Sequence, residues 1–109
     1  QVIEQNIALL QVRGQTRVIS TDALSALKRL EEEKKTVDII YFDPPYSKEL
    51  TYQIIDAVDR SSSLLSREGF FVVEERRGIA LDALKLSNLV LHKIKLFGDS
   101  VLFIFISKI

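Results

Sequence analysis

The four consecutive residues Asp43-Pro44-Pro45-Tyr46 combine side-chain types that could hold an aromatic amine. Each proline fixes its own φ angle and lacks a backbone N–H donor, and Pro45 pushes Pro44 toward an extended conformation. The carbonyl groups near Asp43 and Pro44 are therefore held in place without local donors. Together with the Asp43 carboxylate they form converging acceptors, which suit the two donor hydrogens of an exocyclic amino group.

An aromatic ring follows this acceptor pair directly. Tyr46 could stack on a bound base, a contact that contributes on the order of 1–3 kcal/mol. Acceptors beside a stacking ring form a pocket for a flipped nucleobase. The alternative is a plain turn, because Asp-Pro-Pro at a strand end is also a turn signal and short motifs carry false positives. A buried strand before the corner and a helix after it favour the functional interpretation.

The corner follows a run that is typical of a buried strand. Val37 to Phe42 is apolar except for Asp38, and continuous apolar runs suit a strand that is covered on both faces. The other expected elements are, in order, a helix within residues 1–10, a strand at Thr16–Ser20, a helix capped by Thr21 or Asp22, a helix within 49–65 that packs through Ile54, Ile55 and Val58, a turn at Gly69, a strand at Phe70–Glu74, a helix near 79–84, and a hairpin that turns at Gly98 and Asp99.

Alternating helices and strands predict an open, mostly parallel α/β sheet, to which the terminal hairpin adds an antiparallel edge. Ligands of such sheets bind beyond the carboxyl ends of the strands. The acids Asp22, Asp43 and Glu74 with Glu75 each follow or end a predicted strand. The predicted site therefore lies at one edge of the sheet.

Composition narrows the chemistry further. The chain has 109 residues, 47% of them hydrophobic, which predicts one small globular domain. No cysteine and one histidine exclude a disulfide framework, a thiol nucleophile and a histidine-rich metal site, so no metal is expected. No apolar stretch is long enough to span a membrane, and we expect a cytoplasmic protein. A net charge of zero is unlike an autonomous nucleic-acid binder but leaves a nucleic-acid substrate open.

The stretch "DIIYFDPPY" resembles motif IV, the Asp/Asn-Pro-Pro-aromatic signature of amino-group methyltransferases that use S-adenosylmethionine. The nearest resemblance is to the RsmD-like enzymes, which methylate the N2 amino group of a guanine in small-subunit ribosomal RNA. Other stretches agree in order and spacing, namely "QNIALL", "TRVISTDALSALKRL", "LLSREGFFVVEE" and "LFGDSVLFIF". This resemblance implies a Rossmann-like class I methyltransferase sheet.

On the substrate side, the resemblance assigns roles by position. Asp43 and the Pro44 carbonyl would accept from the target amino group, and Tyr46 would stack on the target base. Pro45 completes this substrate-binding corner. Glu74 would either form a hydrogen bond near the pocket or merely end its strand.

On the cofactor side, the resemblance is incomplete. Asp22 would accept from the adenine amino group of S-adenosylmethionine, with Ala23 beside it. The family begins with a strand and a glycine-rich loop that cradles the cofactor, followed by a second strand ending in an acid. Neither is found in this sequence, whose four glycines are scattered at 14, 69, 78 and 98.

We therefore expect residues 1–109 to be a single partial methyltransferase domain, truncated so that the first two strands and the cofactor cradle are missing. The opening "QVIEQNIALL" reads as if it starts inside a helix, which favours a piece of a longer protein. The missing strands would be central, so the isolated chain should bind cofactor weakly or not at all. It should recruit a partner chain, form a homo-oligomer, or leave sheet edges exposed.

Three function classes follow. The first is guanine-N2 methylation of ribosomal RNA, free or in the small ribosomal subunit, by the full-length protein. The second is DNA adenine-N6 methylation, which shares the Asp-Pro-Pro-Tyr corner. The third is a non-catalytic fragment or interaction module, which the missing cofactor loop favours for the isolated chain.

Overall fold

The computed structural model describes residues 2–44, 48–61, 63–78, 81 and 85–108. Its elements are α1 (Val2–Leu9), a short 3-10 helix η1 (Arg13–Gln15), α2 (Ala23–Glu32), β1 (Val37–Phe42), α3 (Lys48–Arg60), β2 (Leu65–Arg76), β3 (Leu89–Phe97) and β4 (Ser100–Ser107). The helix predicted near 79–84 falls almost entirely outside the described residues.

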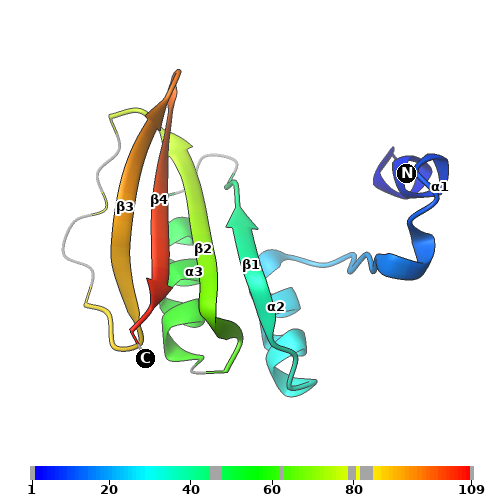
Figure 1. Ribbon diagram of the computed structural model, residues 1–109, viewed down its shortest axis with the longest axis horizontal. Helices are drawn as coiled ribbons and strands as arrows, with labels where there is room; N and C mark the ends of the chain where they lie inside the picture. Colours follow the sequence, from blue (N-terminus) through cyan, green and yellow to red (C-terminus); the bar gives the residue numbers. More distant parts are fainter. Residues whose placement is uncertain (1, 45–47, 62, 79–80, 82–84, 109) are drawn as a thin grey trace.

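The four strands form one sheet in the order β1-β2-β4-β3 (Figure 1). β1 and β2 are parallel, and α3 forms the crossover between them. β3 and β4 form the predicted hairpin, and β4 also pairs antiparallel with β2. Gly98 makes the hairpin turn with a φ of 60°, which glycine adopts without steric cost. The predicted α/β class with a C-terminal antiparallel hairpin is confirmed.

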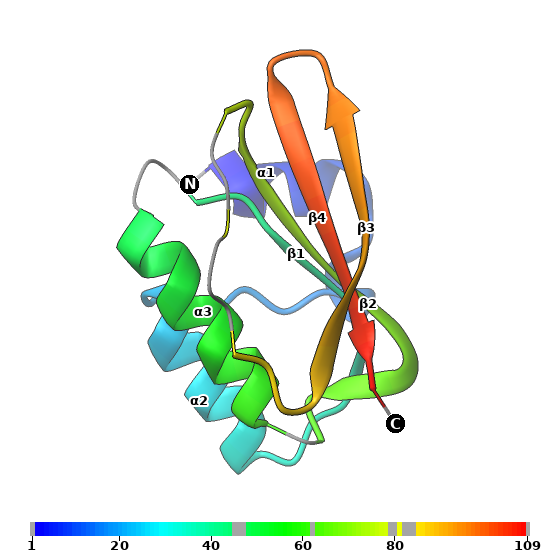
Figure 2. The same cartoon turned by 90° about the vertical axis from the view of Figure 1, so that its left-hand side faces the viewer.

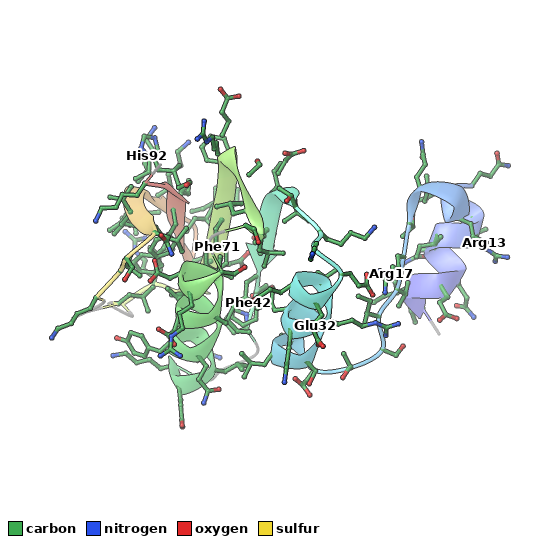
Figure 3. All side chains as sticks on the ribbon, turned by 90° about the horizontal axis from the view of Figure 1, so that it is seen from below. Arg13, Arg17, Glu32, Phe42, Phe71 and His92 are labelled. Atoms are coloured by element: carbon green, nitrogen blue, oxygen red, sulfur yellow. The ribbon has the colours of Figure 1, made fainter. Side chains whose placement is uncertain are left out.

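One face of the sheet packs against α2 and α3, which lie side by side (Figure 2). Ile54, Ile55 and Val58 of α3 are buried, as their helical spacing predicts. They join Phe71 of β2 and Phe105 of β4 in the core, where the two rings lie 5.6 Å apart. Figure 3 shows Phe71 on the side of the sheet that faces α3. Burial of each large apolar side chain stabilises the fold by about 1.5–3 kcal/mol.

The opposite face, here called the open face, carries no helix within the described residues. Ile39 and Tyr41 of β1 are 67% and 57% exposed on it, and Phe70 of β2 is 44% exposed. β1 is also an edge strand, because the sheet order places it beside β2 alone. The prediction that the strand at Val37–Phe42 is covered on both faces is therefore wrong, since every second side chain points to this uncovered side.

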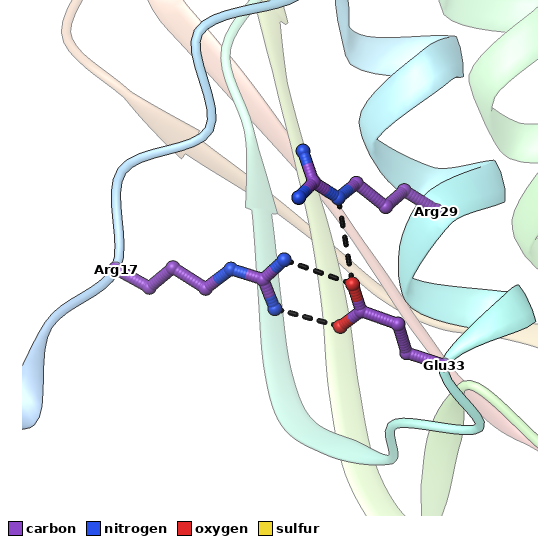
Figure 4. Close-up of polar contacts among 3 residues, drawn as sticks. All are labelled: Arg17, Arg29 and Glu33. Carbon is purple, nitrogen blue, oxygen red and sulfur yellow. Dashed lines mark hydrogen bonds and ion pairs between the residues drawn. The ribbon is translucent and has the colours of Figure 1, made fainter.

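The predicted strand at Thr16–Ser20 does not form. A strand needs a neighbour to pair its N–H and C=O groups, and this segment is not adjacent to any strand of the sheet. It instead connects α2 to α1 and η1, which stand apart from the sheet (Figure 1). The Arg17 guanidinium donates two hydrogen bonds to the Glu33 carboxylate, at 2.7 and 2.9 Å, and Arg29 adds a contact at 3.4 Å (Figure 4).

The predicted turn at Gly69 is also wrong, because β2 begins at Leu65 and passes through this glycine. A Cβ atom built on Gly69 would lie 2.7 Å from the Asp38 carbonyl oxygen. The pairing of β1 with β2 shifts register at the same place, between Val37 and Ile39. Glycine is therefore required here by the close approach of the β1 backbone rather than by a turn.

Candidate functional site

The Asp-Pro-Pro corner begins directly beyond the carboxyl end of β1, where the sequence places it. Asp43 is exposed and Pro44 is buried. Since β1 and β2 are parallel and Phe42 pairs with Val73, the corner lies beside the part of β2 that carries Glu74 and Glu75. Pro45 and Tyr46 lie outside the described residues, so their predicted roles remain predictions.

Glu74 lies on the open face and connects three strands. Its carboxylate accepts a hydrogen bond from the Tyr41 hydroxyl of β1 and another, at 3.2 Å, from Ser100 Oγ of β4. The hydrogen bond to Glu74, with burial and the negative charges of Glu74 and Asp43, raises the pKa of Tyr41 to about 12. Glu74 does not end its strand, which continues to Arg76. Its described partners place it in a polar cluster with Tyr41 near Asp43.

Glu75 points to the other side of β2, toward the helices. It is buried, and its Oε1 accepts a hydrogen bond from the hydroxyl of Thr51, which is fully buried in the first turn of α3. Residues 43–47 therefore connect two fixed points. The pairing of β1 with β2 holds one end, and the Thr51–Glu75 hydrogen bond fastens the helix that follows the other.

This role of Thr51 and Glu75 was not predicted from the sequence, although a signal for it exists. Thr51 falls on the same helical face as Ile55 and Val58, so its burial follows from the 3.6-residue period. Glu75 follows Phe71 and Val73 at alternating positions, which places it on the core face of β2. A polar residue on each of two facing apolar surfaces predicts a hydrogen bond between them.

Asp22 caps α2, as predicted. Its Oδ1 accepts from the Ser25 backbone N–H at 2.8 Å and its Oδ2 accepts from Ser25 Oγ at 3.0 Å. These hydrogen bonds lower the pKa of Asp22 and keep it ionised. Both oxygens retain lone pairs that could accept from a further donor. Ala23 packs partly buried against the core, and nothing in the structure tests the predicted contact of either residue with a cofactor.

Asp59 anchors the far end of α3. Its buried carboxylate accepts from the backbone N–H groups of Ser87, Asn88 and Leu89 at 2.8–3.1 Å. Burial raises the pKa of Asp59, but the three amide donors lower it by more, so the net shift is downward. This contact fastens the start of β3 beneath α3 and is structural.

Other kinds of site are not evident among the described residues. No group of three acids or histidines in them is placed to hold a metal ion. No helix in this part of the chain is long and apolar enough to cross a membrane. A hollow of about 380 Å³ lies away from the corner, beside α1, and is lined by Glu4, Ile7, Arg13, Thr16 and Val18.

Comparison with known proteins agrees with the predicted fold. Among curated proteins, no sequence matches the chain. A solved structure titled "Putative methyltransferase yhhF from Escherichia coli" is 26% identical with a TM-score of 0.73, and the match covers 94% of this chain and 55% of that one. A conserved hypothetical protein from Streptococcus pyogenes is 24% identical with a TM-score of 0.81, over 98% of this chain and 64% of that one.

A "putative methylase" from Haemophilus influenzae is 21% identical with a TM-score of 0.69, over 94% of this chain and 62% of that one. The chain thus spans 55–64% of the length of these three proteins. The printed titles agree with the predicted resemblance to methyltransferases. Since residues 1–106 match the family described as Conserved hypothetical protein 95, the chain belongs to that family.

Proposed function

We propose that this chain supplies the substrate-binding half of an S-adenosylmethionine-dependent methyltransferase that acts on the N2 amino group of a guanine in small-subunit ribosomal RNA. The observation that carries the proposal is the position of Asp43. It is exposed directly beyond the carboxyl end of β1, and the buried Pro44 follows it. Membership of the family and the titled methyltransferase among its structural neighbours support the same reaction class.

The chemistry that these residues offer is positioning. The Asp43 carboxylate and the Pro44 carbonyl oxygen accept the two hydrogens of the target amine, which directs its nitrogen lone pair toward the methyl donor. The nitrogen forms the new bond to the methyl carbon as the bond from that carbon to the cofactor sulfur breaks. The Asp43 carboxylate also stabilises the positive charge that develops on the nitrogen.

S-adenosylmethionine supplies the electrophilic methyl group. Of the described residues, Asp22 suits its adenine amino group, because the carboxylate is exposed, ionised and retains acceptor capacity beyond its two bonds to Ser25. The scattered glycines provide no phosphate-type or methionine cradle. Cofactor affinity in this chain alone should therefore be weak, and titration with S-adenosylhomocysteine against an Asp22→Ala variant measures it.

A binding experiment can test the amine site without requiring turnover. A short RNA hairpin with a loop guanosine is compared with the same hairpin carrying inosine, which lacks only the 2-amino group. We expect tighter binding of the guanosine hairpin, and loss of that preference in Asp43→Ala. Asp56→Ala, an exposed acid on α3, is the matched control and should leave the preference intact.

Equal binding of the guanosine and inosine hairpins contradicts the proposal. A single-stranded DNA pair, with adenine or with purine in its place, examines the second reaction class. A preference for adenine that depends on Asp43, without a guanosine preference, would identify an adenine-N6 site instead.

A further inference from the structure

Beyond the corner, the open face ends in a row of exposed side chains at the hairpin tip. Phe97 of β3 is 76% exposed although it is a large aromatic residue. It pairs with Ser100 of β4, which pairs with Arg76 of β2, so the three lie side by side across the sheet. An aromatic ring exposed next to a cation is a feature of binding surfaces rather than of a solvated hairpin end.

Two more cations share this face. Lys95 pairs with Leu102 and Lys93 pairs with Ile104, and side chains two residues apart on a strand point to the same side. Arg76, Lys93, Lys95 and Phe97 are all exposed. The name tip surface is used here for these four residues. The chain is neutral in total, so three cations gathered at one corner of the sheet mark a local positive region.

The nearby acids do not cancel this region. Glu74 shares the open face, but its carboxylate accepts hydrogen bonds from Tyr41 and Ser100. Asp99 is in the hairpin turn, where its backbone carbonyl accepts from the Arg77 N–H at 2.7 Å. The Arg77 guanidinium also donates to the Gly98 carbonyl at 3.3 Å. These bonds fasten the turn to the end of β2, so the tip surface has a fixed position relative to the corner.

The tip surface continues the candidate site. The carboxyl ends of β1 and β2 and the hairpin turn lie at the same end of the sheet, and the turn extends further (Figure 1). From β1 to β3 the sheet is about 14 Å wide, at the ~4.8 Å spacing of neighbouring strands. A polynucleotide whose amine reached Asp43 would therefore have its flanking nucleotides over Glu74, Arg76 and Phe97.

We propose that the tip surface binds the single-stranded RNA that flanks the target guanine, a role that rests on the proposed function. Phe97 stacks on a flanking base, and Arg76, Lys93 and Lys95 contact phosphates. Single-stranded RNA fits better than a duplex, because only unstacked bases can lie on an exposed aromatic ring. It fits better than a protein partner, because the charges are of one sign and surround a single ring.

The test measures affinity of the full chain for a short single-stranded RNA without guanine, and for a duplex of equal length. Phe97→Ala should weaken single-strand binding about 5- to 140-fold, the equivalent of 1–3 kcal/mol at 1.4 kcal/mol per tenfold. Phe97→Tyr keeps the ring and should retain affinity. The double variant Lys93→Gln/Lys95→Gln should reduce the slope of log affinity against log salt by about 1.4. Lys28→Gln/Lys34→Gln, exposed cations at α2, should leave it unchanged.

The outcomes separate this inference from the proposed function. If the tip variants bind RNA as the unaltered chain does while the Asp43-dependent guanosine preference persists, the tip inference is wrong and the amine site stands. If the tip variants weaken binding but guanosine and inosine hairpins bind equally, the tip surface stands and the amine site fails. Absence of single-strand binding by the unaltered chain, or equal loss in Phe97→Tyr and Phe97→Ala, overturns the tip inference. Circular dichroism of each variant confirms that it is folded.

Discussion

The Thr51 hydroxyl donates a hydrogen bond to Glu75 Oε1, and both residues are buried between α3 and β2. A buried carboxylate is tolerated only where donors compensate its lost hydration. This pair therefore joins the first turn of α3 to the strand beside the Asp43 corner. Its stability and the geometry of the corner are consequently coupled.

Replacement of Thr51 by valine tests that coupling, because valine keeps the shape and removes the hydroxyl. Loss of this donor beside the buried Glu75 should lower the free energy of unfolding by about 1–3 kcal/mol. Urea denaturation measures the change. Thr51→Ser keeps the hydroxyl and loses a methyl group, so it should be the milder substitution. A Thr51→Val protein as stable as Thr51→Ser would mean that the hydrogen bond contributes little.

The contact between Tyr41 and Glu74 predicts an unusual alkaline titration. The pKa of Tyr41 is raised to about 12 from 10.0, chiefly because its hydroxyl donates to Glu74. Ultraviolet absorbance of the phenolate, with Tyr41→Phe subtracted, should show this late titration, and Glu74→Gln should return it toward 10. Because the folded pKa is the higher one, the contact stabilises the fold fully below pH 10 and loses that contribution as the pH rises toward 12. A phenolate that forms near pH 10 in the unaltered chain would contradict the contact.

Local patterns predicted those elements that need no distant partner. Helical spacing identified Ile54, Ile55 and Val58, and Asp22 was recognised as a cap because its partner Ser25 is three residues away. The position of Asp43 beyond a strand was likewise readable from the apolar run and the prolines that follow it.

Features that depend on a neighbouring strand were not predictable in this way. Thr16–Ser20 has strand-like residues but no strand beside it, so no ladder forms. Gly69 looked like a turn because glycine often marks one, whereas its cause is the Asp38 carbonyl across the sheet. Thr51 and Glu75 are 24 residues apart, and only the packing of α3 on β2 brings them together.

The buried Asp59 carboxylate should be a main contributor to stability. Asparagine in its place keeps the size but loses the charge, and its amide donor would face the N–H groups of Ser87, Asn88 and Leu89. Hydrogen bonds to a charged acceptor contribute about 1.5–3 kcal/mol, so Asp59→Asn should destabilise the fold by at least this much at neutral pH. Chemical denaturation at pH 7 provides the measurement, with the exposed Asp56→Asn as control.

The same substitution should alter the acid response. The pKa of Asp59 lies below its usual value of 3.8, so its contribution is present above that pH and is lost as the pH falls through the folded value. The difference in stability between the unaltered chain and Asp59→Asn should therefore shrink in acid. A difference that is constant from pH 7 into the acid range would show that the charge of Asp59 is not what holds the start of β3.

The ion pair of Arg17 with Glu33 should determine whether the N-terminal part stays attached to α2. Hydrogen bonds from Arg17, opposed by burial and aided by the charges of Arg17 and Arg29, lower the pKa of Glu33 to about 2 from 4.5. Carboxyl carbon shifts in nuclear magnetic resonance should report this value, and Arg17→Gln should raise it substantially. Because the folded pKa is the lower one, the attachment is complete above pH 4.5 and weakens as the pH falls toward 2. Limited proteolysis between residues 11 and 20 should accordingly be faster in Arg17→Gln than in Arg13→Gln, whose guanidinium is in η1 rather than beside Glu33; equal rates would mean that the pair does not hold this segment.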